Sequence, residues 1–267
     1  MLAYFWPKKH FDLLIQMTLR EIQQRYKGSW LGMGWAIITP LIMLVVYTFV
    51  FQSVFQARWP GMELETHSGV QFALNLFVGI IFFTLFSDVM TRSPGIISQQ
   101  PNLVKKVVFP LELMPWVIVL SALFQAMISF IILIAGTWLL LGSVPLSAIY
   151  LPLLILFFLP LLFGMAWGLA GLGVYVPDMQ HLTAMITTPL MFLSPVFYPI
   201  SMLPEWAQPW LNLNPLTLVI EAGRAIFFGS QWPEWSLMLA YVVVAFCCLI
   251  IGALSFHKLR KGFADVL

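Results

Sequence analysis

The chain has 267 residues, of which 61% are hydrophobic and only 9% are charged. Soluble globular domains contain roughly 45–50% apolar and about 25% charged residues. This composition therefore excludes an ordinary soluble domain and indicates a membrane protein. The formal net charge of +2 is small, so we expect no nucleic-acid partner.

Residues 8–27 predict an amphipathic helix ahead of the first long apolar stretch. Apolar side chains recur there at spacings of three and four, which places them on one face of a helix. They are Phe11, Ile15, Leu19, Ile22 and Tyr26. A helix of this kind lies in the membrane plane with its apolar face toward the acyl chains. Its simplest role is an anchor that fixes the first span.

Six later stretches are long enough to cross a bilayer, which takes about 20 mainly apolar residues. Backbone in lipid must satisfy its hydrogen bonds internally, so each stretch predicts a helix. The six are Leu31–Phe55, Val70–Met90, Leu111–Leu141, Ala148–Val176, Leu182–Ile200 and Leu237–His257. We therefore expect an all-α membrane protein with one domain, residues 1–267. It comprises the interface helix 8–27, a six-span bundle at 31–257 and a tail at 258–267.

The basic residues predict the orientation of these spans, because cytoplasmic flanks are enriched in Lys and Arg. Apart from Arg58 and Arg224, every Lys and Arg lies before the first span, between the second and third, or after the sixth. Both termini are therefore expected on the cytoplasmic side, which an even number of spans requires.

The segment Ser194–Trp235, between the fifth and sixth spans, is apolar and aromatic but is interrupted by six prolines. Proline removes a backbone donor and stops helices. We predict short helices that re-enter the outer leaflet and form a gate, with an apolar cap on the bundle as the alternative. Glu221 and Arg224 lie within reach of each other on a helix. An exposed pair of this kind contributes only about 0.2–0.5 kcal/mol, so a structural role requires burial.

The sequence contains no set of residues typical of an active site. His10, His67, His181 and His257 lie outside the spans or at their ends, without metal-ligand spacing. A phosphate-binding glycine loop and a catalytic triad are both missing. We therefore expect a transport subunit with no metal site and no cofactor of its own. An intramembrane glycosyltransferase is the alternative, disfavoured by the lack of an acid, base or metal set.

Aromatic side chains inside the predicted spans are candidates for a sugar path, because aromatic faces suit the C–H groups of sugar rings. Aromatic residues are equally common in cores and at membrane interfaces. The candidates are Trp35, Tyr47, Phe51, Phe82, Phe86 and Tyr198. The fourth span also carries Gly164 and Gly168 four residues apart, a spacing that lets helices approach closely.

Four segments together carry a family resemblance: "REIQQRYKGSWLGMGWAIITPLIMLVVYTFVFQSVF", "NLVKKVVFPLELMP", "SPVFYPISMLPEW" and "NPLTLVIEAGRAIFFG". Their order resembles the transmembrane subunit of ABC-2-type polysaccharide exporters, the Wzm-like permeases of O-antigen, teichoic-acid and capsule systems. The resemblance covers nearly the whole chain. It implies a homodimer in the bacterial cytoplasmic (inner) membrane, with two copies of a separate ATPase that binds ATP and Mg. It also implies a lipid-pyrophosphate-linked glycan as cargo. An ABC-2 exporter of a small molecule or drug is the alternative with the same fold.

The resemblance also implies two sets of site residues. The first is a substrate entrance, where an Arg fork matches paired phosphate oxygens; it comprises Arg20, Arg25, Tyr26, Lys27 and Trp30. The second is an ATPase-coupling set that includes a segment at Gly95–Lys106; it comprises Ile96, Ile97, Asn102, Leu103, Lys105, Lys106 and Asp178. Many members of the family have Arg-Asp after the fourth span, where this sequence has Pro177-Asp178. Only the Asp therefore carries over.

Overall fold

The computed structural model describes residues 7–51, 68–105, 109–229 and 235–267, and every regular element within these ranges is helical. The longer helices are α2 (Phe11–Tyr26), α3 (Trp35–Phe49), α4 (Ser68–Arg92), α6 (Leu113–Leu141), α7 (Leu151–Tyr175), α8 (Met179–Phe192) and α11 (Trp235–Leu259). The shorter ones are α5 (Pro101–Lys105), α9 (Gln208–Asn212), α10 (Pro215–Arg224) and α12 (Phe263–Val266). The all-α prediction is therefore confirmed for the described part of the chain.

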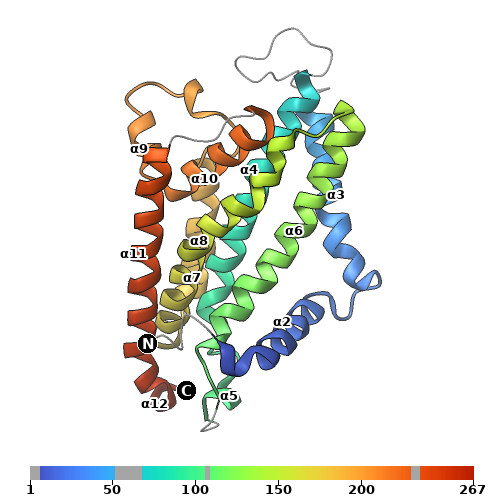
Figure 1. Ribbon diagram of the computed structural model, residues 1–267. Coiled ribbons are helices and arrows are strands. Elements are labelled where there is room, and N and C mark those ends of the chain that lie inside the picture. The colour runs from blue at the N-terminus through green and yellow to red at the C-terminus, as the bar shows by residue number, and fades with distance from the viewer. Residues whose placement is uncertain (1–6, 52–67, 106–108, 230–234) are drawn as a thin grey trace.

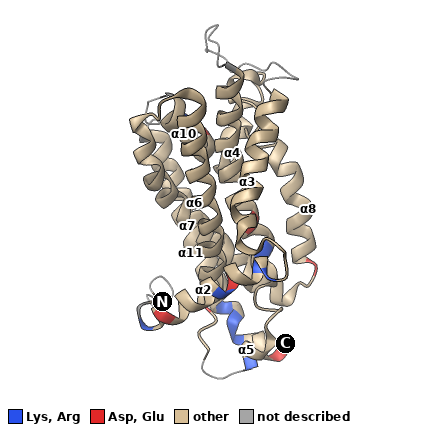
Figure 2. Cartoon of the chain, turned by 90° about the vertical axis from the view of Figure 1, so that its right-hand side faces the viewer, with Lys and Arg blue, Asp and Glu red and all other residues tan. Residues whose placement is uncertain are grey.

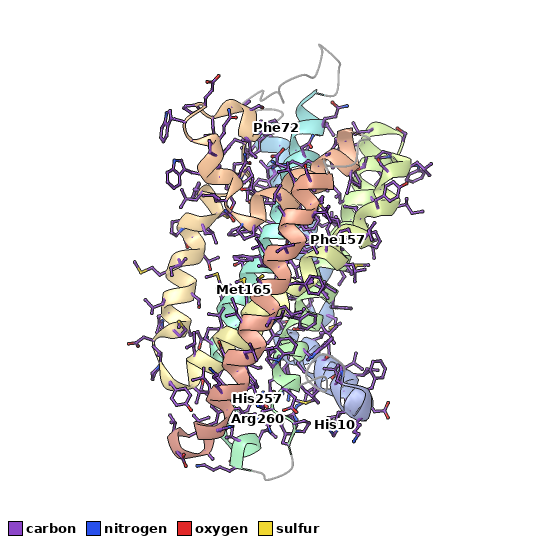
Figure 3. The ribbon with its side chains drawn as sticks, turned by 60° about the vertical axis from the view of Figure 1, so that its left-hand side comes forward. His10, Phe72, Phe157, Met165, His257 and Arg260 are labelled. Carbon is purple, nitrogen blue, oxygen red and sulfur yellow. The ribbon has the colours of Figure 1, made fainter. Side chains whose placement is uncertain are left out.

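The long helices lie side by side in a bundle (Figure 1). Helices α2, α5 and α12 lie at one end, which we call the α2 end, and α9 and α10 lie at the other, the α10 end. Figure 3 shows His10, His257 and Arg260 at the α2 end and Phe72 toward the α10 end. Helix α2 runs obliquely to the long helices and packs on α6.

The apolar stripe predicted for α2 is partly buried and partly exposed. Ile22 is buried, as is the neighbouring Leu14, whereas Phe11, Ile15 and Leu19 are exposed. The buried pair holds α2 on the bundle, and the exposed ridge is available to acyl chains, as expected for a helix at a membrane interface.

Five helices are long and apolar enough to cross a membrane: Gly32–Phe49, Gly69–Gly95, Leu113–Leu141, Leu146–Tyr175 and Ser236–Val266. They confirm a multi-pass membrane protein, although the predicted end of the first span at Phe55 lies outside the described residues. The fifth predicted span, Leu182–Ile200, is helical over only part of its length, so a sixth crossing stays a prediction. Its helix α8 ends at Phe192, and its 14 residues rise only about 21 Å at 1.5 Å per residue. Pro195 and Pro199 follow and cannot continue the helical hydrogen bonding.

Helix α4 occupies the centre of the bundle. Within its most apolar window 78% of the residues are buried, against 17% for α3, because α4 packs on α3, α6, α7, α8 and α10. Phe82 is fully buried, with ring centroids 5.4 Å from Phe130 on α6 and 6.1 Å from Phe158 on α7. Motion of α4 would therefore disturb its contacts with five other helices.

Helices α7 and α11 make the closest contact in the described structure. A Cβ atom on Gly164 would overlap the backbone of Cys248, and one on Gly252 would overlap the Gly164 carbonyl. A Cβ on Gly168 would meet only the Cα of Gly252, at 3.8 Å. The glycine spacing thus allows close helix approach, as predicted, and Gly164 has a stricter requirement than Gly168.

We predict that Gly164→Ala lowers the melting temperature of the purified protein, because α7 and α11 must separate to admit the methyl group. Overpacking of this kind costs about 1–3 kcal/mol. Gly168→Ala is the matched control, since its methyl group enters ordinary van der Waals space. Equal melting temperatures for the two variants, measured in lipid nanodiscs, would contradict the close approach.

The chain between α8 and α11 forms short helices, as the prolines predict. Helix α10 begins at Pro215, and the Asn214 side chain caps it by accepting a hydrogen bond from the Leu216 backbone at 3.0 Å. One π-helical turn, Ala225–Gly229, follows α10. The depth of these helices in the membrane remains a prediction.

Arg224, at the end of α10, ties three parts of the α10 end together. Its side chain is only 4% exposed. The guanidinium donates to the carbonyl of Asn75 on α4 at 3.1 Å and to the carbonyls of Pro195 and Val196, each at 2.6 Å. It also pairs with Glu221 at 2.9 Å, so the predicted pair is present and is partly buried. One side chain thus fixes the segment after α8 against both α10 and α4.

We predict that Arg224→Met destabilises the protein by about 3–5 kcal/mol, the usual cost of breaking a buried ion pair by removing one partner. The carbonyls of Pro195 and Val196 lose their donors at the same time. Arg260→Met is the control, because Arg260 pairs with Glu112 at 2.6 Å but is 42% exposed. Exposed pairs contribute about 1 kcal/mol or less. Comparable losses in both variants, in chemical unfolding experiments, would exclude a special role for the buried arginine.

Candidate functional site

Four charged side chains form a continuous chain of ion pairs between α2 and α4. Arg25 donates to both carboxylate oxygens of Asp88, at 2.6 and 3.1 Å. Arg92 donates to Asp88 at 3.0 Å and also pairs with Glu21. Two positive and two negative groups make this network formally neutral. Figure 2 shows that charged residues are concentrated toward the α2 end of the molecule.

The helical spacing of these residues explains the network. Glu21 and Arg25 are four residues apart on α2, and Asp88 and Arg92 are four apart on α4. Residues at this spacing lie on the same helix face. Glu21 and Arg25 of α2 therefore face Arg92 and Asp88 of α4 where the helices meet. The side chain of Asp88 is 12% exposed and that of Arg25 is 35% exposed. Arg25 is therefore the member of this pair that is more open to solvent.

A second polar link joins α2 to α6 and α3. The Tyr26 hydroxyl donates to Gln125 Oε1 at 2.5 Å, and Gln125 Nε2 donates to the Ala36 carbonyl at 2.9 Å. Burial raises the pKa of Tyr26 above its ordinary value, so the phenol remains a hydrogen-bond donor at neutral pH. Gln125 thereby fixes the end of α2 beside the start of α3.

A cavity of about 370 Å³ lies between α3, α4 and α6, beside these polar groups. Arg25, Tyr26, Asp88 and Gln125 supply much of its polar lining. The remaining lining is largely apolar and extends along α3 and α4; it includes Trp35, Pro40, Met43, Tyr47, Phe77 and Ile81. Ligand pockets usually measure about 300–1,000 Å³. The arrangement suits an amphipathic molecule with an anionic group near Arg25.

The structure brings only part of the predicted entrance set to this cavity. Arg25 and Tyr26 line it. Arg20 and Lys27 are exposed elsewhere on the surface, and Trp30, just before α3, is 97% exposed.

The predicted aromatic path is also divided. Trp35 and Tyr47 line the cavity, whereas Phe82 and Phe86 are buried in the core. The cavity-lining residues of α4 are 77, 80, 81, 83, 84, 85 and 88. Phe82 and Phe86 are not among them, and both pack in the core of this subunit. Phe51 lies 5.0 Å from Phe72, centroid to centroid. Tyr198, at the α10 end, donates to the Phe192 carbonyl at 2.7 Å.

Sequence reasoning missed four residues of the site: Glu21, Asp88, Arg92 and Gln125. A usable signal existed for all four. Glu21 with Arg25, and Asp88 with Arg92, have the spacing of a helical ion pair, and Gln125 is a lone amide inside an apolar span. Their meeting with α2 depends on tertiary packing and is not visible in the sequence.

The predicted coupling segment begins with a short 3₁₀ turn, Ser93–Gly95, and ends with α5. Ile96 and Ile97 are 5% and 1% exposed. They therefore hold the segment on its own bundle, and their role in ATPase coupling stays a prediction. Leu103 is half-buried, and Asn102 and Lys105 are exposed. Lys106 lies outside the described residues.

Helices α7 and α12 support this segment. A Cβ on Gly173 of α7 would overlap the Pro94 carbonyl, so the 3₁₀ turn lies directly on α7. Asp178 is exposed on the turn between α7 and α8. Helix α12 contacts both α5 and α7. Its Phe263 is 1% exposed, with ring centroids 5.7 Å from Phe256 and 6.0 Å from Tyr175.

Comparison with protein families matches residues 12–228 to the ABC-2 type transporter family. The O-antigen export system permease protein RfbA of Myxococcus xanthus is 28% identical over 263 residues, which cover 95% of this chain and 94% of the relative. A protein of the same name from Klebsiella pneumoniae is 24% identical over 258 residues, covering 96% and 95%. The polysialic acid transport protein KpsM of Escherichia coli is 27% identical over 251 residues, or 92% of each chain. The family match covers most of the sequence, and the chain therefore belongs to the ABC-2 type transporter family.

Proposed function

We propose that this chain is the membrane-spanning permease subunit of an ABC transporter that exports a polysaccharide. The observation that carries the proposal is similarity over nearly the full length to relatives named for O-antigen export and polysialic acid transport. These names favour a glycan over the small molecule or drug of the alternative.

The working unit is a homodimer with two copies of a separate ATPase, which binds ATP and Mg. It resides in the bacterial cytoplasmic membrane, with both termini in the cytoplasm and six crossings per subunit. Two observations support this topology. Helices α2 and α12 lie at the same end of the bundle, and charged residues gather there, as the positive-inside rule expects. The exposed apolar faces of α3 and α8 are available to lipid or to the second subunit.

The cargo is a glycan attached to a lipid pyrophosphate, and it enters at the cavity beside α2. Arg25 offers a planar fork for paired phosphate oxygens, and the Tyr26 hydroxyl becomes a second donor when it leaves Gln125. The apolar wall along α3 and α4 accepts the lipid, while Trp35 and Tyr47 offer ring faces to sugars. At the α10 end, Tyr198 and the segment held by Arg224 form the gate. The ATPase contacts Asn102, Lys105 and Asp178.

Co-purification tests the assignment. The tagged chain is expressed with the ABC ATPase encoded beside it, and the complex is reconstituted in nanodiscs. We expect the two proteins to elute together, and lipid-pyrophosphate-linked glycan to stimulate ATP hydrolysis. Stimulation by amphipathic drugs, with no response to the glycan lipid, would support the small-molecule alternative instead.

We predict that Arg25→Lys lowers glycan-stimulated ATPase activity and export while abundance and topology stay normal. Lysine preserves the positive charge that attracts anionic headgroups, about 1 kcal/mol per basic residue, but lacks the two-pronged fork. Arg20→Lys is the matched control, because Arg20 lies off the cavity on the same helix. Full activity in Arg25→Lys would mean that Arg25 acts only as a charged anchor.

We also predict that Ile97→Ala uncouples the two activities: ATP hydrolysis continues while export falls. The lost side chain loosens the coupling segment, and truncation of a buried isoleucine costs about 2–5 kcal/mol. Ile251→Ala, at a site 64% exposed on α11, is the control. The ratio of glycan exported to ATP consumed is the measurement, and an unchanged ratio in Ile97→Ala would place coupling elsewhere.

A further inference from the structure

The guanidinium proposed to receive the cargo phosphate is already occupied. Two of its nitrogens donate to the two oxygens of Asp88, at 2.6 and 3.1 Å. Carboxylate and phosphate bind an arginine fork in the same two-pronged manner. A diphosphate therefore cannot take this face of Arg25 while Asp88 holds it.

Asp88 has a second cationic partner, so the loss of Arg25 would not leave its carboxylate without a counter-charge. Asp88 also accepts from Arg92 at 3.0 Å, and Arg92 is further held by Glu21 and by the Ser121 hydroxyl at 3.3 Å. Removing one partner from a buried pair is costly because the other charge is left uncompensated. Here Asp88 keeps its pair with Arg92, whose charge is then shared between Asp88 and Glu21, so exchange at Arg25 removes only one of the two cationic partners of Asp88.

The location of Asp88 places the exchange at the cavity itself. Asp88 and Arg25 both line the cavity, together with Tyr26 and Gln125. The apolar continuation along α3 and α4 is adjacent, so an anion at Arg25 would have its hydrocarbon chain in the apolar part. Arg25 is the more exposed partner of the pair, and an incoming anion therefore reaches it without unfolding α4.

We propose that Asp88 is an internal substitute for the diphosphate group of the cargo: it holds Arg25 when the site is empty and gives it up when a lipid diphosphate binds. This inference rests on the proposed function. The exchange removes the Arg25 link between α2 and α4 and leaves the Glu21–Arg92 link in place. Binding of cargo at Arg25 thereby removes one of the links that hold the Tyr26 end of α2, and it does not itself break the bond of Tyr26 to Gln125.

The test is equilibrium binding of radiolabelled farnesyl diphosphate to the full-length protein in neutral-lipid nanodiscs. We expect Asp88→Asn to bind about three- to tenfold more tightly than wild type, because the competing partly exposed ion pair is removed. Glu21→Gln is the matched control. It removes the same charge from the same network without touching Arg25, and we expect a change below about twofold. In the double variant Arg25→Lys/Asp88→Asn the gain disappears.

Further arms separate the sources of the anion. Inorganic pyrophosphate and farnesol are each expected to bind more weakly than farnesyl diphosphate, and phosphatidylglycerol in the nanodisc is expected to compete poorly. Asp88→Ser repeats the test if the asparagine variant proves unstable.

Equal gains in Asp88→Asn and Glu21→Gln would attribute the effect to net charge and overturn the exchange. An Arg25-dependent affinity that no Asp88 variant improves would do the same while leaving the proposed function intact. Binding that is absent, or identical in wild type and Arg25→Lys, would remove the diphosphate site of the proposed function itself.

Discussion

The neutral chain of ion pairs between α2 and α4 is the constraint on which the rest of this structure depends. Charges next to a membrane interior are tolerated when they are paired, and here each charged group has an opposite partner on the other helix or on its own. The network fixes an interface helix to the most buried helix of the bundle. It also leaves one cation, Arg25, at the edge of an amphipathic cavity. A polar group of a ligand can therefore bind beside the apolar interior of the bundle at this point.

Helix α4 extends this constraint to the other end of the molecule. Asp88 pairs with α2, and the Asn75 carbonyl, about 20 Å away at 1.5 Å per residue, accepts from Arg224. The two polar contacts are thus mounted on one helix that packs on α3, α6, α7, α8 and α10. A displacement of α4 would act on the cavity and on the segment after α8 together. This is a physical connection between the proposed entrance and the proposed gate, and the exchange at Arg25 is one event that would bias it.

Much of the fold follows from the sequence because the bilayer leaves few choices. Long apolar runs must form helices, and the prolines after Phe192 explain both the short α8 and the short helices beyond it. The sequence does not show which face of each long helix lines the cavity, because a helix that is apolar all round has no preferred side. The sequence therefore does not distinguish Phe82 and Phe86, which pack in the core, from Phe77 and Ile81, which line the cavity. Ile96 and Ile97 are a similar case: the sequence shows two apolar residues in a loop, and only the structure shows that they face inward.

The candidate site was predictable to the extent that its residues are local. Arg25 and Tyr26 stand out at the junction of a basic helix and an apolar span. Their partners Asp88 and Gln125 lie far away in the sequence, and a pair formed by tertiary contact has no sequence spacing to reveal it. The family resemblance supplied the function, and the structure supplied the carboxylate that competes for the same arginine.

Reconstituted transport tests the central claim most directly. The permease and its ATPase are placed in proteoliposomes together with a short lipid-pyrophosphate-linked glycan, and a membrane-impermeant lectin reports the glycan that reaches the far leaflet. Our account predicts ATP-dependent appearance of the glycan there, reduced in Arg25→Lys complexes that still hydrolyse ATP. Glycan that stays in its original leaflet, despite ATP hydrolysis by an intact wild-type complex, would contradict it.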